Sequence, residues 1–108
     1  MVIPLKKLNN GFALPIYGLG TWQMGGRMTR DVNNDDESDI RAIKKAIDLG
    51  ITHIDTADSY ADGYSEVLVG KAIKDYERSK LFIVSKAHVD RLGHDDLIRA
   101  CKASLERL

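Results

Sequence analysis

The chain has 108 residues, 44% of them hydrophobic and 30% charged, which suits one small globular domain. Sixteen basic residues balance sixteen acidic ones, and this balance argues against a protein that binds nucleic acid or a membrane surface by charge. The single cysteine cannot form an internal disulfide and no apolar run reaches the length of a membrane span, so we expect a cytoplasmic protein.

The first two expected elements are a β-hairpin over residues 5–14 and a short strand over residues 17–22. The Asn10-Gly11 pair supplies the hairpin turn, because both residue types tolerate positive φ angles. In the strand, Gly18 and Gly20 lie on the same face, since side chains alternate along a strand. That face is bare, so a flat group could approach the backbone there.

A long polar loop over residues 23–36 follows, of the kind that is usually functional or mobile. Beyond it, helices alternate with strands. Apolar residues at helical spacing predict helices over about 37–49, over 65 to about 74, and from 94 or 95 onward. Apolar runs predict strands over about 52–55 and 81–85, the latter buried on both faces. The buried stripe of the last helix is expected to consist of Leu97, Ile98, Cys101, Leu105 and Leu108.

A hairpin followed by three βα units predicts an α/β fold with a parallel sheet and right-handed crossovers. The chain stops at Leu108, inside a periodic helical pattern. Three parallel strands also leave two open edges. We therefore expect these residues to be the first part of a larger structure.

Two charged residues follow two of the expected strands. Asp55 ends one apolar run and Lys86 follows the next. The carboxyl ends of neighbouring parallel strands meet at one edge of the sheet, where α/β folds place their sites, so we expect these residues to pair. Tyr60 lies in the loop after Asp55. A nearby ammonium favours an ionised phenol, and such a tyrosine can give a proton to a carbonyl oxygen.

These residues and their neighbours resemble the aldo-keto reductase family in order and spacing. The matching stretches are Gly18–Trp22, Gly50–Ala57, Tyr60, Ser65-Glu66, Gly70 and Ile83–Lys86. The resemblance covers nearly the whole chain and implies a partial (β/α)8 TIM barrel, in which residues 1–108 form the N-terminal part of a single barrel domain. It also implies an oxidoreductase that uses NADPH to reduce aldehydes or ketones to alcohols, with a small carbonyl compound as substrate.

The resemblance implies roles for individual residues as well. Asp55, Tyr60 and Lys86 match catalytic residues of the family, with Tyr60 as the general acid. The residues expected beside the nicotinamide cofactor or the substrate are Gly20, Thr21, Trp22 and Asp55. The family's fourth catalytic residue is a histidine on the fourth barrel strand, which these residues do not reach. We therefore expect residues 1–108 by themselves to show little or no reductase activity.

Other interpretations stay open beside this one. Asp55 could cap a turn, Lys86 could be a solvated strand end, and Tyr60 could be an ordinary loop aromatic. Gly18 and Gly20 do not complete a dinucleotide-binding fingerprint, because Gln23 stands where its third glycine is needed. At the level of the whole protein, the rivals are a non-catalytic nicotinamide-binding regulatory subunit and a truncated remnant that self-associates through its sheet edges. No metal site is expected, because the three histidines lack the spacing of metal ligands.

Overall fold

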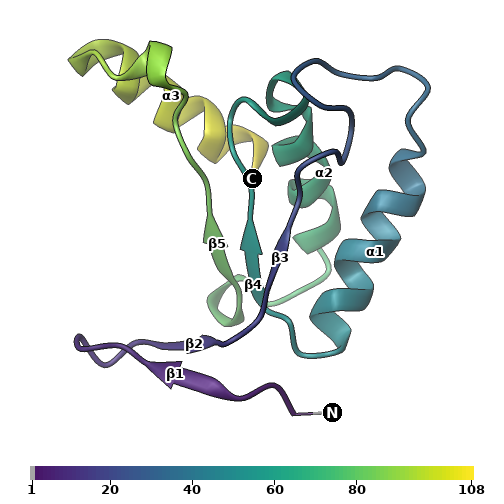
Figure 1. Ribbon diagram of the computed structural model, residues 1–108, viewed down its shortest axis with the longest axis vertical. Coiled ribbons are helices and arrows are strands. Elements are labelled where there is room, and N and C mark those ends of the chain that lie inside the picture. The colour runs from purple at the N-terminus through teal and green to yellow at the C-terminus, as the bar shows by residue number, and fades with distance from the viewer. Residues whose placement is uncertain (1) are drawn as a thin grey trace.

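The computed structural model describes residues 2–108 and shows a hairpin, a parallel sheet and three helices within that range (Figure 1). In chain order the elements are β1 (Leu5–Lys7), β2 (Ala13–Pro15), β3 (Gly18–Gly20), α1 (Asp36–Asp48), β4 (His53–Asp55), α2 (Tyr64–Ile73), β5 (Phe82–Val84) and α3 (His94–Arg107). This order confirms the predicted hairpin and three βα units. None of these helices is long and apolar enough to cross a membrane.

The hairpin of β1 and β2 lies across the end of the sheet at which the parallel strands begin (Figure 1). Its turn contains Gly11 at a φ of 88°, as the Asn-Gly pair predicts. Phe12 packs edge to face on Phe82 of β5, with ring centroids 5.6 Å apart. Phe82 in turn contacts the ring of His53 on β4 at 5.4 Å. The hairpin therefore covers the lower end of one face of the sheet.

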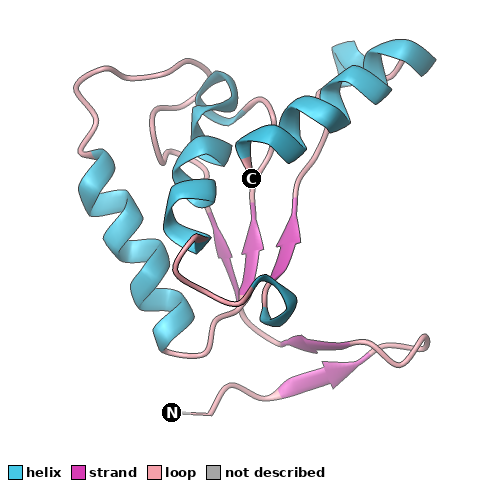
Figure 2. Ribbon diagram, turned by 180° about the vertical axis from the view of Figure 1, so that it is seen from behind, coloured by secondary structure: helices cyan, strands magenta, loops and turns pink. Residues whose placement is uncertain are grey.

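The sheet has the order β3-β4-β5 and is parallel throughout. Its register places Leu19, Ile54 and Ile83 in one row across the three strands. This row packs against apolar side chains of α1 and α2, which lie beside the sheet in Figure 2. The buried residues of this core are Ile43, Ile47, Ile54, Val69, Ala72, Ile73 and Leu81. One face of the sheet is thus covered by helices.

The opposite face carries the polar groups. Because side chains alternate along a strand, Gly20, Asp55 and Val84 form the last row on that face, and Gly20 is paired directly with Asp55. Lys86 lies two residues beyond Val84 and so follows the same side. The sheet register alone therefore brings a bare glycine, a carboxylate and a lysine to one edge.

The loop over residues 23–35 is tethered to the start of α1. The Asp35 side chain caps α1 by accepting from the backbone N–H of Ser38 at 3.0 Å. In the first turn of α1, Asp39 accepts from the backbone N–H of Gly25 at 3.1 Å and from the Asn34 amide at 2.8 Å. The long polar loop predicted from the sequence is thus bound to the helix that follows it.

Two burial predictions were wrong. In α3 the one buried residue is Ala100, whereas Leu105 is 71% exposed and Cys101 is exposed. The apolar stripe exists, but within residues 2–108 no element covers its outer part. The strand β5 was expected to be buried on both faces, but it is only half-buried. It forms an edge of the sheet, where no further strand covers it within residues 2–108.

Candidate active site

An ion pair joins the carboxyl ends of two neighbouring strands. The Lys86 Nζ donates to Asp55 Oδ2 at 2.7 Å and to the backbone carbonyl of Thr56 at 2.8 Å. Asp55 is the last residue of β4, and its side chain remains 40% exposed. The structure thus brings together the two residues that the sequence placed at this edge.

The environment of Lys86 keeps its ammonium charged. Partial burial acts to lower the pKa of this lysine, but the hydrogen bond and the charge of Asp55 outweigh burial, so the pKa lies above the ordinary lysine value. Tyr60 adds a smaller contribution in the same direction. Asp55 therefore both orients the ammonium and stabilises its charge.

Tyr60 lies above this pair, in the turn that leads into α2. The Lys86 Nζ is 5.1 Å from the centroid of the Tyr60 ring. The turn is strained, because Ala61 and Asp62 both adopt positive φ angles, of 52° and 54°. The backbone N–H of Ala61 donates to the carbonyl of Arg27 at 2.5 Å, so the long loop holds the turn in this shape. A constrained turn of this kind presents the phenol to the same edge as the ion pair.

The last residue of β3 and the two residues after it differ in their surroundings. Gly20 has nothing within 4 Å of the position that a Cβ would occupy, so the space beside Asp55 is open. Trp22 is 44% exposed and packs edge to face on Tyr60, with ring centroids 5.1 Å apart. Thr21, by contrast, is fully buried, and its hydroxyl donates to the Asp55 carbonyl at 3.0 Å. Its side chain offers no surface to a cofactor.

Residues that sequence reasoning did not assign hold this edge from the helix side. Ser65, in the first turn of α2, donates to the Thr21 carbonyl at 3.0 Å. Glu66 is fully buried and accepts from the Ser85 hydroxyl and from Arg107 Nε, the latter at 2.6 Å. The sequence did indicate that Glu66 is buried, because it shares the apolar face of α2 with Val69, Gly70 and Ile73 at helical spacing. No pattern could have predicted Arg107, which is 41 residues away.

A second buried carboxylate joins the loops that follow β4 and β5. Asp58 is 4% exposed, and its Oδ1 accepts from the backbone N–H of His88 at 3.0 Å. Its Oδ2 lies 3.5 Å from the Arg91 guanidinium, and this ion pair lacks hydrogen-bond geometry. Asp58 therefore fixes the loop beyond Lys86 against the loop that carries Tyr60.

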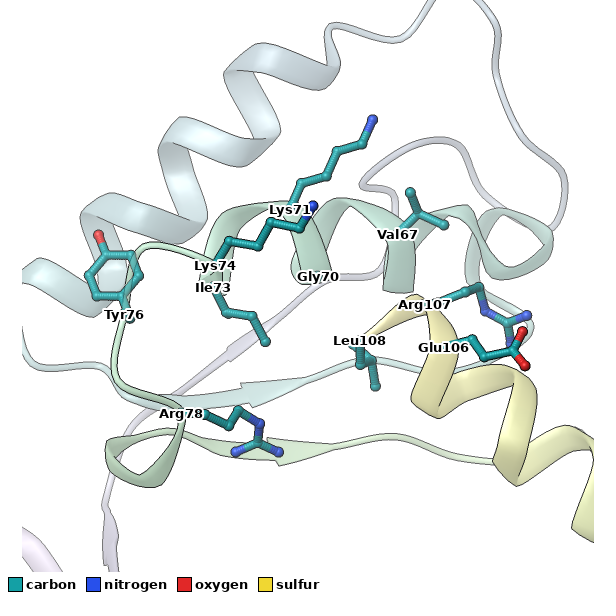
Figure 3. A pocket seen from close by; sticks show the side chains of 10 residues that line it. All are labelled: Val67, Gly70, Lys71, Ile73, Lys74, Tyr76, Arg78, Glu106, Arg107 and Leu108. Atoms are coloured by element: carbon teal, nitrogen blue, oxygen red, sulfur yellow. The ribbon is translucent and has the colours of Figure 1, made fainter.

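A groove between two of these helices is not part of this edge. It has a volume of about 530 Å³ and lies between α2 and the end of α3, where Lys71, Lys74 and Arg78 line it (Figure 3). None of the side chains of Asp55, Tyr60 and Lys86 lines that groove. Within residues 2–108 no cluster of three or more histidine, cysteine or acidic residues could hold a metal ion. The ion pair and the phenol are therefore the candidate site.

Comparison with known proteins gives a consistent result. The sequence model described as Aldo/keto reductase family matches residues 17–108. Methylglyoxal reductase YeaE of Escherichia coli (strain K12) is 42% identical over 96 residues, a stretch that makes up 89% of this chain and 32% of the relative. The chain thus spans about a third of the length of this curated relative.

Two solved structures share the fold. The crystal structure of the thermostable aldo-keto reductase Tm1743 in complex with the inhibitor epalrestat matches with a TM-score of 0.93 and 46% identity, covering 97% of this chain and 38% of that one. The aldo-keto reductase from Klebsiella pneumoniae in complex with NADPH matches with a TM-score of 0.82 and 37% identity, covering 99% of this chain and 36% of that one. The predicted partial (β/α)8 barrel is thereby confirmed, and within residues 2–108 the barrel is not closed.

Proposed function

Because the chain belongs to the aldo-keto reductase family, we propose that it is the N-terminal part of a barrel enzyme that reduces aldehydes or ketones to alcohols with NADPH. The observation that carries this proposal is the contact of Lys86 with both Asp55 and the Tyr60 ring, at 2.7 Å and 5.1 Å. A charged ammonium this close to the Tyr60 ring supports a role for Lys86 in stabilising the ionised phenol. The relative that reduces methylglyoxal supports a small carbonyl compound as substrate.

The residues present fit a nicotinamide cofactor. The face beside Asp55 is open at Gly20, where a flat ring can approach the backbone without meeting a side chain. Trp22 borders this space and leaves 44% of its surface exposed. The NADPH bound by the Klebsiella pneumoniae relative supports the same cofactor here. We infer that Gly20, Trp22 and Asp55 contact it, and that Thr21 contributes only by holding the Asp55 backbone.

Each residue then has a defined task in the reduction. The cofactor supplies the hydride that reaches the carbonyl carbon. The Tyr60 hydroxyl donates a proton to the carbonyl oxygen, which becomes the alcohol. The Lys86 ammonium stabilises the phenolate that Tyr60 becomes, and Asp55 keeps that ammonium charged and oriented. Edge-to-face packing of Trp22 on Tyr60 limits the orientation of the phenol.

The test is the rate of NADPH oxidation with methylglyoxal and other small aldehydes, measured on the protein as its source produces it. Tyr60→Phe keeps the ring and its packing on Trp22 but removes the proton donor. We expect the rate to fall at least about a hundredfold while NADPH still binds. A Tyr60→Phe protein that retains the full rate would overturn the assignment of Tyr60 as the acid. NADPH binding without turnover in the unsubstituted protein would instead favour a regulatory subunit.

A second candidate is self-association. Apolar side chains of α3 remain exposed, at 41% for Leu97 and 45% for Ile98, and β3 and β5 form open sheet edges. In the reductase proposal, further βα units cover these surfaces. If residues 1–108 act alone, copies of the chain would cover them, and the size in solution would increase with protein concentration.

We also propose a cytoplasmic location, which the lone cysteine supports because it has no internal disulfide partner.

A further inference from the structure

Glu66 is a buried carboxylate that the proposed reaction does not use. It lies in the first turn of α2 and is fully buried. An isolated carboxylate in such a position is strongly unfavourable, so its oxygens need partners. The Oε2 atom accepts from Arg107 Nε at 2.6 Å, and Oε1 accepts from the Ser85 hydroxyl. The positive end of the α2 dipole adds to this stabilisation.

The partner on the strand side is next to the proposed catalytic lysine. Ser85 directly precedes Lys86, and successive side chains point to opposite faces. The Ser85 hydroxyl therefore points toward the helices, while Lys86 extends to the other face and reaches Asp55. Because the Lys86 carbonyl also accepts from the backbone N–H of Asp58 at 3.0 Å, this stretch is held both along the sheet and from the helix layer.

Arg107 connects the same carboxylate to the end of α3. In Figure 3 its side chain extends from the last turn of α3 toward the N-terminal end of α2. The two helices approach each other closely at Gly70. A Cβ at this position would lie only 2.0 Å from the Arg107 carbonyl oxygen. Arg107 thus balances the charge of Glu66 and docks α3 on α2.

The residue before Glu66 makes a parallel set of contacts. Ser65 donates to the Thr21 carbonyl at 3.0 Å and lies 3.2 Å from the Thr21 hydroxyl. Thr21 in turn donates to the Asp55 carbonyl. Two consecutive residues at the start of α2 therefore bind the chain directly after β3 and β5, and they reach the end of β4 through Thr21.

We propose that Glu66 is a positioning residue for Lys86, because its carboxylate holds the Ser85 hydroxyl and so fixes the backbone from which the lysine reaches Asp55. The proposal rests on the function proposed above, in which Lys86 supports the proton donor. A buried ion pair is a poor means of adding stability, since well-packed apolar residues often do as well. Two directed bonds from one carboxylate, in contrast, specify where a strand end lies relative to a helix.

The test observes Lys86 directly. The ammonium groups of ordered lysines give proton–nitrogen correlation signals in NMR spectra of the nitrogen-15-labelled protein, and Lys86→Arg assigns the signal that disappears. Ser85→Ala removes one hydroxyl and leaves the Glu66–Arg107 pair in place. We expect the Lys86 signal to shift or broaden in Ser85→Ala and in Glu66→Gln. The internal control is Lys44, which pairs at 2.6 Å with Asp75, beyond the C-terminal end of α2, whereas Glu66 lies in the first turn of that helix.

A conservative variant separates positioning from general stability. Ser85→Thr keeps a hydroxyl, and the cavity of about 200 Å³ beside Ser85, which Cys101 and Ser104 also line, has room for the added methyl group. This variant should restore the Lys86 signal. A Lys86 signal that is unchanged in Ser85→Ala would overturn the proposal, even if Glu66→Gln fails to fold. Equal changes at Lys86 and Lys44 would also overturn it, because they would indicate a general loss of structure.

Kinetics gives an independent readout. In an active protein, Ser85→Ala should lower kcat and leave the KM for NADPH unchanged, since no cofactor contact is removed. The NMR signal reports the placement of Lys86 whether or not the protein reduces carbonyls. A shifted signal combined with full activity of Tyr60→Phe would therefore refute the reductase mechanism and leave the positioning role intact.

Discussion

The Lys86 Nζ lies 2.7 Å from Asp55 Oδ2, although the two residues are 31 positions apart in the chain. The contact crosses from β4 to the residues that follow β5, so it forms only when the parallel register is correct. Variants that weaken this ion pair therefore test both the register of the sheet and the proposed role of Lys86.

The first prediction concerns the pH dependence of this pair. The folded-state pKa of Lys86 lies above its unfolded value, so the stability from the pair is complete below the unfolded pKa, about 10.4, and is lost as pH rises through the folded pKa. Lys86→Met should therefore lower the free energy of unfolding more at about pH 7 than at about pH 11.5. The effect should be small, because both side chains are 40% or more exposed. Urea unfolding at the two pH values measures it.

The control for this experiment is Lys45→Met, which removes an exposed lysine of α1 that makes no ion pair within residues 2–108. Equal destabilisation by Lys86→Met at both pH values would contradict the prediction.

The second prediction concerns the contact between α2 and α3. Glycine inside a helix is usually less stable than alanine by about 1 kcal/mol. At Gly70 we expect alanine to destabilise the protein instead, because the added Cβ would lie 2.0 Å from the Arg107 carbonyl oxygen. We expect Gly70→Ala to lower the free energy of unfolding by about 1–3 kcal/mol, typical of overpacking. Limited proteolysis should also show α3 cleaved sooner.

Gly93→Ala is the matched control, since its Cβ meets only the flexible Asp96 side chain, at 3.3 Å. Similar proteolysis of the Gly70 and Gly93 variants would contradict a close contact between the helices.

The third prediction concerns the strained turn after Tyr60. Asp62 is exposed and has a φ of 54°, a left-handed conformation that disfavours residues with a Cβ. Asp62→Gly should be more stable than Asp62→Ala by about 1 kcal/mol, because only glycine adopts this conformation freely. Both variants lack the carboxylate, so the comparison isolates the backbone term. Thermal unfolding measures the difference, and a more stable alanine variant would show that the turn is not strained.

The fourth prediction concerns the open space beside Asp55. Gly20→Ala meets no protein atom within 4 Å, so the thermal midpoint should not fall. The added methyl group occupies the face on which we place the nicotinamide, so NADPH affinity should decrease. Quenching of Trp22, the one tryptophan of the chain, measures the dissociation constant. Unchanged affinity would mean that the cofactor does not approach Gly20.

Local patterns predicted much of this molecule. The apolar spacing of α1 and α2, the Asn-Gly turn and the apolar runs of β4 and β5 are properties of short stretches, and the structure has all of them within a few residues of the predicted bounds. The pairing of Asp55 with Lys86 was also predictable, because parallel neighbouring strands bring their carboxyl ends together.

The burial and the hydrogen-bond partners of individual residues depended on which elements pack against each other. Periodicity identified the apolar stripe of α3, but it could not show whether another element packs on that stripe. Cys101 was therefore expected in the core, whereas the structure shows it exposed. Thr21 was expected beside a cofactor; its side chain is buried, and its hydroxyl and backbone carbonyl both accept from Ser65 of α2, which the sequence did not indicate. The partners of Glu66 come from β5 and α3, at separations that carry no local signal.

The sequence by itself therefore determined the order of the elements, the face of each helix that is apolar, and the residues that we propose for proton transfer. These properties follow from backbone conformation and side-chain periodicity, which act over a few residues. Only the tertiary structure decided which polar groups are buried and what binds them. A buried carboxylate such as Glu66 is stable only when distant donors converge on it, and that convergence is a property of the packed fold.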